Sequence, residues 1–348
     1  MRLKTACIFL MIITWLFFNS CSNTTEPGES NKDPREMTWT VDTLYYPQSL
    51  QTNTYNLLAL NSGHIYAYGH CDFVKGSVFE YNGHNWKPLE LLTRFKKMIA
   101  LSETNIWGFG GSSAGVISHY NGYNWMDDHS INAPFPFQGA TADLSNTIYA
   151  CGDKGIVARY NWDGWSYENT NLKLPCTENY SLFRIGYFNN RLFFNGIAHS
   201  ESTGDTWYYF ISKEGDKYKL LDSVKNWPSK YTWGTNGFYK SPWGKYFSFG
   251  RGGIWQLMDD KWVPYYETEN VYDFVSAIQG TSEDYYFILK YTDILFCNVS
   301  AKTSIKNKIN IDYNNILLED IWTDGREVFI TGLTTGPWPT KTIIIHGK

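Results

Sequence analysis

A pattern of about 42 residues recurs along the chain and constrains the fold more than any other feature. Each clear copy has an apolar, aromatic segment that ends in glycine, then a second segment that ends in Tyr-Asn and leads to a tryptophan. The glycines that mark the three clear copies are Gly69, Gly110 and Gly152, at steps of 41 and 42 residues. Weaker copies occupy Leu192–Gly196, Tyr246–Gly250, Tyr285–Leu289 and Val328–Gly332. A regular spacing of this length indicates a repeat architecture.

Each copy predicts four short strands, of which the first is apolar and the second ends in the marker glycine. The first strands are expected at Leu57–Leu60, Met98–Leu101 and Thr141–Leu144. The 15 Trp, 26 Tyr and 21 Phe favour strands, and the 29 Gly supply turns. A period of about 40–45 residues with four strands per unit is typical of a β-propeller, in which each unit forms one blade. The sequence therefore predicts an all-β chain with a single β-propeller over residues 37–348. Seven four-stranded blades are expected, with six or eight left open because the fourth and sixth copies are degenerate.

The link between the third and fourth strands has its own signature. Asn-Gly follows the tyrosine in two of the clear copies, at Asn82-Gly83 and Asn121-Gly122. Both residue types tolerate positive φ, so a tight hairpin is expected there. The tryptophan that follows should pack against the neighbouring blade and bury a large ring, which makes it a structural residue rather than a ligand contact.

The two ends of the predicted propeller complement each other. The last copy stops at Lys348 after its third strand and lacks a fourth strand with its tryptophan. The segment Trp39–Leu44 resembles a fourth strand with no unit before it. If Trp39–Leu44 completes the last blade, the ring closes and no sheet edge stays open.

The N-terminal sequence predicts an export signal. Arg2 and Lys4 precede an apolar run from Ala6 to Phe18, which is typical of a secretory signal and short for a membrane span. The run ends in Phe-Asn-Ser-Cys, which resembles the bacterial lipobox. That resemblance implies that residues 1–20 are a signal peptide and that Cys21 carries the lipid.

Residues 21–36 are predicted to be a flexible tether because they contain no large apolar side chain. The chain as a whole resembles repeat propellers of exported bacterial lipoproteins, at the level of the repeat only. The resemblance implies a location in the bacterial cell envelope, on the outer membrane or cell surface rather than the inner membrane. The membrane would be a partner through the lipid at Cys21.

Charge and cysteine usage limit the partners. The chain has 30 Lys and Arg against 34 Asp and Glu, which argues against a nucleic-acid partner. We expect a monomeric propeller with no cofactor and no metal site, because no metal-binding spacing is present. The cysteines of the predicted propeller are expected to be buried free thiols rather than disulfides, and they are Cys71, Cys151, Cys176 and Cys297.

No catalytic set of residues stands out in the sequence. The segment from Ser200 to Trp207 resembles the Asp-box turn of sialidase-type propellers, but Ser202 replaces its defining aspartate. The segment Phe183–Gly186 is similar to a sialidase arginine motif and is better explained by chance. Enzyme activity therefore stays open, and the sequence favours a non-catalytic role.

Ligands of propellers usually meet one face, which is built by the loops that enter the first strands and by those that join strands two and three. The longest loops of the second kind are expected at Ile197–Asp205 and Leu333–Pro339. Exposed loop residues are the natural candidates for binding. The candidate ligand residues, taken from all the loops that join strands two and three, are His70, Asp72, His199, Glu201, Arg251, Asp293 and Trp338.

Three functions are compatible with this organisation. The leading hypothesis is a membrane-anchored envelope lipoprotein that binds or scaffolds a protein or a glycan without catalysis. The first alternative is a glycan-active hydrolase or lyase with its site at the channel mouth, which requires acidic or basic residues to converge there. The second alternative is an assembly factor for a membrane complex.

Overall fold

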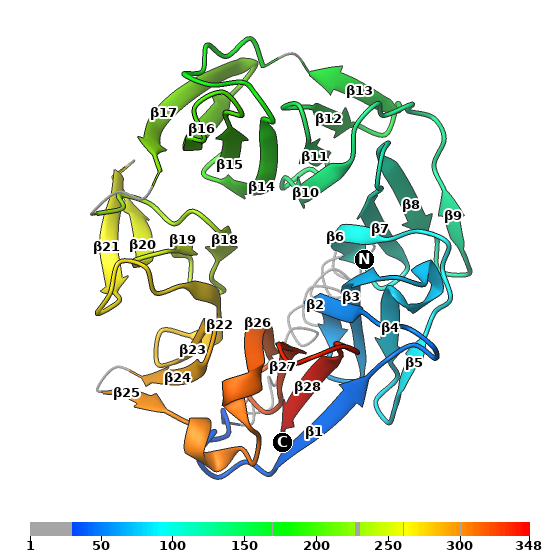
Figure 1. Ribbon diagram of the computed structural model, residues 1–348, viewed down its shortest axis with the longest axis vertical. Helices are drawn as coiled ribbons and strands as arrows, with labels where there is room; N and C mark the ends of the chain where they lie inside the picture. Colours follow the sequence, from blue (N-terminus) through cyan, green and yellow to red (C-terminus); the bar gives the residue numbers. More distant parts are fainter. Residues whose placement is uncertain (1–29, 169, 227–229, 260, 299–300) are drawn as a thin grey trace, which may run out of the picture. The chain divides into compact units, whose positions relative to one another are not determined.

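The computed structural model describes residues 30–348, except 169, 227–229, 260 and 299–300. Residues Lys32–Lys348 form one compact unit. Within this unit, seven four-stranded antiparallel sheets are arranged as the blades of a ring (Figure 1). The fold is a seven-bladed β-propeller, so the predicted class and the predicted number of blades are confirmed.

Each blade runs from an inner strand beside the ring axis to an outer strand at the rim (Figure 1). The inner strands are β2 (Thr52–Asn61), β6 (Phe95–Ser102), β10 (Phe137–Ala142), β14 (Ser181–Phe188), β18 (Gly237–Lys240), β22 (Val275–Ser282) and β26 (Ile316–Thr323). The second strands are β3 (His64–Cys71), β7 (Asn105–Gly110), β11 (Ile148–Gly152), β15 (Arg191–His199), β19 (Tyr246–Gly250), β23 (Tyr285–Lys290) and β27 (Val328–Thr334).

The third strands are β4 (Val78–Tyr81), β8 (Val116–Tyr120), β12 (Val157–Tyr160), β16 (Thr206–Glu214), β20 (Gly253–Met258), β24 (Asp293–Asn298) and β28 (Thr342–Gly347). The outer strands are β5 (Trp86–Pro88), β9 (Trp125–Asp127), β13 (Trp165–Glu168), β17 (Lys217–Lys225), β21 (Lys261–Glu267), β25 (Ala301–Ser304) and β1 (Trp39–Leu44). Three short 3-10 helices complete the described part, and they are η1 (Val74–Gly76), η2 (Lys306–Lys308) and η3 (Tyr313–Asn315).

The hydrophobic core is divided among the contacts between blades. Seven clusters of buried apolar side chains each combine residues of two neighbouring blades, one cluster for every interface of the ring. The second strands are buried over almost their whole length, as in β7 and β11, because other strands flank them and blades cover both faces. This burial explains their continuous apolar sequences.

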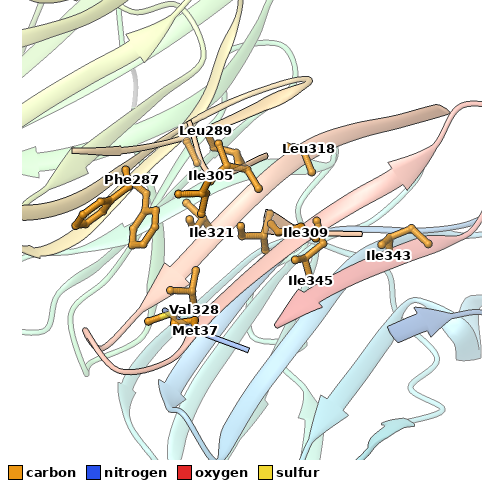
Figure 2. Packing of buried hydrophobic residues seen from close by; sticks show 14 of the residues in the cluster. Met37, Phe287, Leu289, Ile305, Ile309, Leu318, Ile321, Val328, Ile343 and Ile345 are labelled. Atoms are coloured by element: carbon orange, nitrogen blue, oxygen red, sulfur yellow. The ribbon is translucent and has the colours of Figure 1, made fainter. Parts of the chain in front are cut away.

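The N-terminal strand closes the ring as predicted. Strand β1 pairs antiparallel with β28 from Trp39 opposite Gly347 to Leu44 opposite Thr342. Met37, just before β1, is buried in the cluster between the sixth and seventh blades, beside Val328 and other apolar side chains (Figure 2). The last blade therefore contains both the first and the last strand of the chain.

The structured unit begins earlier than the predicted boundary at Met37. The Lys32 N–H donates to the Gly325 carbonyl at 2.7 Å, and the Trp39 indole N–H donates to the Pro34 carbonyl at 3.1 Å. Residues from Lys32 onward belong to the propeller unit because these contacts hold them on the last blade. Cys21 and residues 1–29 lie outside the described residues, and so do the predicted signal peptide and most of the tether.

A β-bulge interrupts the inner strand near its start in most blades. In β6, Phe95 pairs with Gly110 and Lys97 pairs with Phe109, so Lys96 is the extra residue. The same shift occurs in β10, β14, β22 and β26, and β2 has a wider one between Asn53 and Asn56. A bulge of this kind redirects the side chains at and after the extra residue.

The marker glycine of the repeat is explained by this bulge. A Cβ on Gly110 would lie 2.0 Å from the Arg94 carbonyl oxygen, and one on Gly152 would lie 2.1 Å from the Pro136 carbonyl oxygen. Both contacts are far below van der Waals distance, and both are with the backbone that enters the inner strand. Only glycine lets the second strand approach the inner strand closely at this point.

Two local predictions need correction. The third inner strand is Phe137–Ala142, so the predicted Thr141–Leu144 is displaced by several residues toward the C-terminus. The Asn-Gly turns are not two-residue hairpins, because Gly83 and Gly122 have positive φ but the asparagines do not. Instead, the Asn121 side-chain oxygen accepts hydrogen bonds from the backbone N–H groups of Tyr123 and Asn124 at 3.0 and 3.1 Å. The turn is a four-residue loop closed by the asparagine side chain.

The structural role of the repeat tryptophans is confirmed. The Trp165 ring lies 5.9 Å from the Trp107 ring of the preceding blade, centroid to centroid, and its indole N–H donates to Asp128 at 2.9 Å. Trp86 and Trp125 pack against the clusters that they share with the blades before them. The cysteines of the propeller are unpaired, and all except the half-buried Cys176 are buried.

Candidate ligand-binding channel

The seven loop residues selected from the sequence are distributed around one face of the ring and do not converge. They lie near the links between the second and third strands of five blades. Strand β3 extends through His70, and strand β15 extends through His199. None of the seven residues lines the central cavity described below.

Asp72 is fully used in holding a neighbouring segment. Its carboxylate accepts hydrogen bonds from the Ser49 hydroxyl at 2.9 Å and from the backbone N–H groups of Leu50 and Gln51, both at 2.8 Å. Burial raises the pKa of Asp72, but these hydrogen bonds outweigh it and the pKa is lowered overall. Asp72 therefore fixes the chain between β1 and β2.

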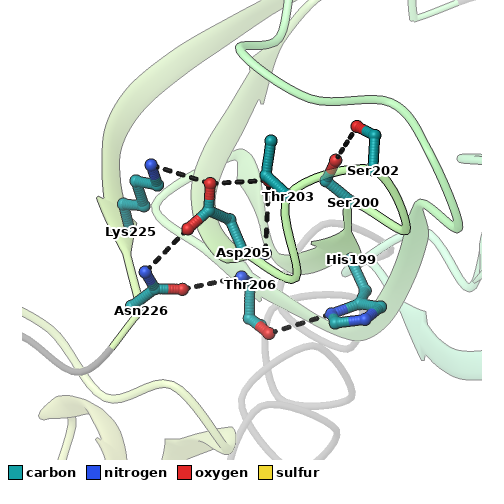
Figure 3. Close-up of polar contacts among 8 residues, drawn as sticks. All are labelled: His199, Ser200, Ser202, Thr203, Asp205, Thr206, Lys225 and Asn226. Carbon is teal, nitrogen blue, oxygen red and sulfur yellow. Dashed lines mark hydrogen bonds and ion pairs between the residues drawn. The ribbon is translucent and has the colours of Figure 1, made fainter.

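The longest predicted ligand loop, between β15 and β16, is held by hydrogen bonds within the loop and by contacts with the end of β17 (Figure 3). Asp205 accepts hydrogen bonds from Thr203 at 2.6 Å and from Asn226 at 2.9 Å, and it pairs with Lys225 at 2.8 Å. These contacts lower the pKa of Asp205, and the hydrogen bond with Lys225 contributes most. Asp205 thus connects the turn that resembles an Asp-box to the end of β17. At the ends of the two strands that this loop joins, His199 contacts the Thr206 hydroxyl at 3.2 Å.

The remaining candidates have mixed environments. Glu201 accepts a hydrogen bond from the Asn179 side chain at 3.0 Å, and Asp293 accepts one from the Ser304 hydroxyl at 2.6 Å. Arg251 is half-buried and its backbone bridges to Phe274, a residue that lines the cavity. Trp338 is 60% exposed on the loop between β27 and β28.

The central channel contains a cavity of about 460 Å³. All seven inner strands contribute to its lining, together with Asn236, Phe249, Phe274 and Tyr291 from adjoining segments. The contributing stretches are Tyr55–Ala59, Lys96–Lys97, Gly139–Ala140, Arg184–Ile185, Gly237–Tyr239, Ser276–Gln279 and Glu319–Trp322. The volume is within the range of small-molecule binding sites.

The bulges bring charged residues into this cavity. Lys96, Lys97 and Arg184 line it from β6 and β14, and Glu319 and Asp320 line it from β26. Each of these residues is the extra residue of a bulge or the one directly after it. Three cations and two carboxylates from three blades thus share one partly enclosed space.

Burial and mutual charge perturb these groups. Burial raises the pKa of Glu319 to about 7, and the neighbouring Asp320 adds to the rise while Arg184 opposes it. Burial also raises the pKa of Asp320, against the backbone hydrogen bond from Leu57 and the charge of Lys97. Burial lowers the pKa of Lys97, and Asp320 opposes that fall. Several perturbed groups in one cavity are typical of a functional site.

The sequence patterns did not select these five channel residues, although Arg184 lies in the segment set aside as a chance similarity to sialidases. One feature of the sequence could have indicated these channel residues. Two successive charges, Lys96-Lys97 and Glu319-Asp320, interrupt otherwise apolar strands and break the alternation of a regular strand. Within the described residues, no group of three or more His, Cys, Asp or Glu side chains could hold a metal ion.

Comparisons with known proteins find similar folds but no related sequence. No protein-family model matches the chain, and no curated protein matches it. Among solved structures, YCF48 from Cyanidioschyzon merolae has a TM-score of 0.54 at 12% identity, over 87% of this chain and 98% of that one. The extracellular domain of a protein described as a hybrid two-component system of B. thetaiotaomicron has a TM-score of 0.56 at 12% identity. That match covers 88% of this chain and 39% of the other. At this identity the similarities support the fold alone.

Within the described residues, no helix has the length and apolar character needed to cross a membrane.

Proposed function

We propose that this chain is a lipid-anchored binding module of the bacterial cell envelope, and that its central channel takes up a small ligand or the end of a larger one. The observation that carries the proposal is the cavity of about 460 Å³ at the axis, lined by all seven inner strands and containing charged groups. The lipobox-like segment before Cys21 supports the envelope location.

A channel-blocking variant tests where the ligand binds. Gln279 lines the cavity from β22 and is half-buried, so Gln279→Trp would fill part of the space. Leu221→Trp places the same ring on the exposed outer strand β17 and is the matched control. We would titrate the mature chain, from Cys21 onward with a non-lipidated residue at position 21, with neutral and acidic sugars, amino acids and short peptides by calorimetry.

Binding that Gln279→Trp abolishes and Leu221→Trp leaves intact would support a channel site. Absence of binding for every ligand class, or equal binding by both variants, would refute it. Pull-down from envelope extracts with the same pair of variants would separate this role from that of an assembly factor, whose partner would be retained by both.

A glycan-active enzyme is the second candidate, and Glu319 favours it. A general acid works best when its pKa is close to the working pH, and burial raises the pKa of Glu319 to about 7. Basic and acidic residues also converge in the cavity, as this alternative requires. In this scheme Glu319 protonates the leaving oxygen as the glycosidic C–O bond breaks. A water molecule attacks the sugar carbon and gives its proton to the Asp320 carboxylate, the second carboxylate of the cavity. Release of new reducing ends from a glycan panel, and its loss in Glu319→Gln, would support catalysis, whereas binding without product would exclude it for that panel.

A further inference from the structure

The two carboxylates of the channel differ in how far hydrogen bonds within the protein already occupy them. Asp320 accepts a hydrogen bond from the Leu57 N–H on Oδ2 and one from the Ile321 N–H on Oδ1, both at 2.9 Å. Leu57 belongs to the first blade and Asp320 to the seventh, so this carboxylate links the blades that close the ring. Asp320 is therefore engaged in the structure, and Glu319 is the acid that stays available.

The cationic side chains of the channel have few partners of their own. Within the described part of the chain, Lys96 and Lys97 form no hydrogen bond or ion pair. Arg184 donates one hydrogen bond, from Nη1 to the Phe183 carbonyl at 2.9 Å, and forms no ion pair with any described residue. The side-chain amide nitrogen of Asn56 is buried at the cavity wall without a hydrogen-bond partner.

The side chains of Lys96, Lys97 and Arg184 and the amide nitrogen of Asn56 are all hydrogen-bond donors. A buried donor without an acceptor is unfavourable, and cations in a partly enclosed site interact strongly with an anion that carries several oxygens. We propose that Lys97, Arg184 and Asn56, with Lys96 beside them, bind a carboxylate or phosphate group of a saccharide-sized ligand. This inference rests on the proposed function and specifies the chemistry of its ligand.

The rest of the lining fits a ring-shaped ligand. Phe274 and Tyr291 stack on each other with centroids 4.6 Å apart and planes at 15°, and both line the cavity. Tyr55 and Trp322 add further aromatic surface from the first and last blades. A few polar groups that fix orientation among apolar and aromatic walls are typical of small-molecule sites. The cavity volume of about 460 Å³ admits one or two sugar rings but no folded protein domain.

Matched ligands test the anionic group. We would measure the affinity of the mature chain for glucuronate, glucose 6-phosphate and glucose by calorimetry, so that a carboxylate, a phosphate and no charge are compared on one ring. We expect at least one of the anionic sugars to bind about tenfold or more tightly than glucose. The stronger of the two identifies which anionic group the site prefers.

Matched variants test the residues. Lys97→Met and Arg184→Met should each weaken binding of the anionic sugar about tenfold or more, and Lys97→Arg should retain most of it. Lys219→Met removes a charge on the exposed outer strand β17 and should leave the affinity unchanged. Thermal melts of each variant check that it is folded.

Three results would overturn the inference. The first is a glucose affinity equal to that of both anionic sugars, and the second is an affinity within twofold of the parent in both Lys97→Met and Arg184→Met. In the first case, equal binding of the three sugars that Gln279→Trp blocks would refute the anion site and leave the proposed function standing. The third is no binding of any of the three sugars while another ligand class binds the channel. If no ligand of any class binds, the proposed function itself fails.

Discussion

Replacement of Glu319 by glutamine should make the protein more stable at neutral and alkaline pH. Burial raises the pKa of this carboxyl from 4.5 to about 7. The charged form is therefore unfavourable in the folded protein, where Asp320 repels it and Arg184 offsets only part of the cost. Glutamine has nearly the same shape and stays neutral at every pH.

The direction of the pH dependence follows from proton binding in the two states. Below pH 4.5 both the folded and the unfolded chain hold the Glu319 proton, so this residue contributes no pH dependence. Between pH 4.5 and 7 the unfolded chain releases the proton while the folded chain keeps it, so the free energy of unfolding falls as the pH rises. Above pH 7 the loss is complete.

The size of the effect follows from the same pKa values. A rise of the pKa from 4.5 to about 7 corresponds to about 3 kcal/mol, and partial access of channel water to the half-buried side chain reduces it to about 2–3 kcal/mol. For a unit of this length, that corresponds to about 3–5 °C in Tm. Glu319→Gln should therefore melt about 3–5 °C above the parent at pH 8 and at the same temperature as the parent at pH 4.

Thermal and denaturant unfolding at pH 4, 6 and 8 would measure the difference. Glu214→Gln, at the exposed end of β16, is the matched control and should show no offset between pH 4 and pH 8. Equal stability of Glu319→Gln and the parent at pH 8 would refute the argument, and so would an offset that persists undiminished at pH 4. Asp320, Lys97, Arg184 and Tyr291 are the charged or titratable groups that interact with this site, so they are left unchanged in the test.

Three further predictions concern the fold and the anchor. Deletion of the chain up to and including Leu44 should open the ring and lower Tm, because β28 loses its partner, and equal Tm values would refute closure. Gly110→Ala should cost about 1–3 kcal/mol of unfolding free energy, because its Cβ would lie 2.0 Å from a backbone oxygen, whereas Gly336→Ala, with open space around it, should be neutral. Cys21→Ala should release a folded propeller from the membrane fraction, and continued membrane retention in fractionation would contradict lipid anchoring.

The fold could be predicted well from the sequence because the residues that define the repeat are those that the fold requires. The glycines mark the close approach of two strands, the tryptophans fill the contacts between blades, and the unpaired segment Trp39–Leu44 matches the missing strand. The turn type was wrong because a propensity for positive φ does not say whether asparagine uses its backbone or its side chain. In Asn121 the side chain closes the turn.

The candidate channel site was harder to predict, because loop length was a poor guide to it. The polar groups of the long loop that contains Asp205 are paired within the loop and with the end of β17, so its length reflects a stable turn. The charges that remain available lie on strands, where a regular alternation would send only every second side chain to the channel. A bulge changes which side chains face the axis, and its position depends on pairing with the next strand, which sequence alone does not display.

The repeat and the channel site nevertheless have one structural origin. In the second, third, fourth and seventh blades, the marker glycine pairs with the residue directly before the bulge. The backbone geometry is thus repeated around the ring, but the extra residue of the bulge differs from blade to blade. These residues are Lys96, Gln138, Phe183, Ser276 and Glu319. A fold that required one particular side chain at this position would repeat it as it repeats the glycine, so the bulge itself accepts different residues there. In some blades the side chain has a structural role, as in the hydrogen bond from the Ser276 hydroxyl to the Leu289 carbonyl, and in others, as at Lys96, the position can serve binding.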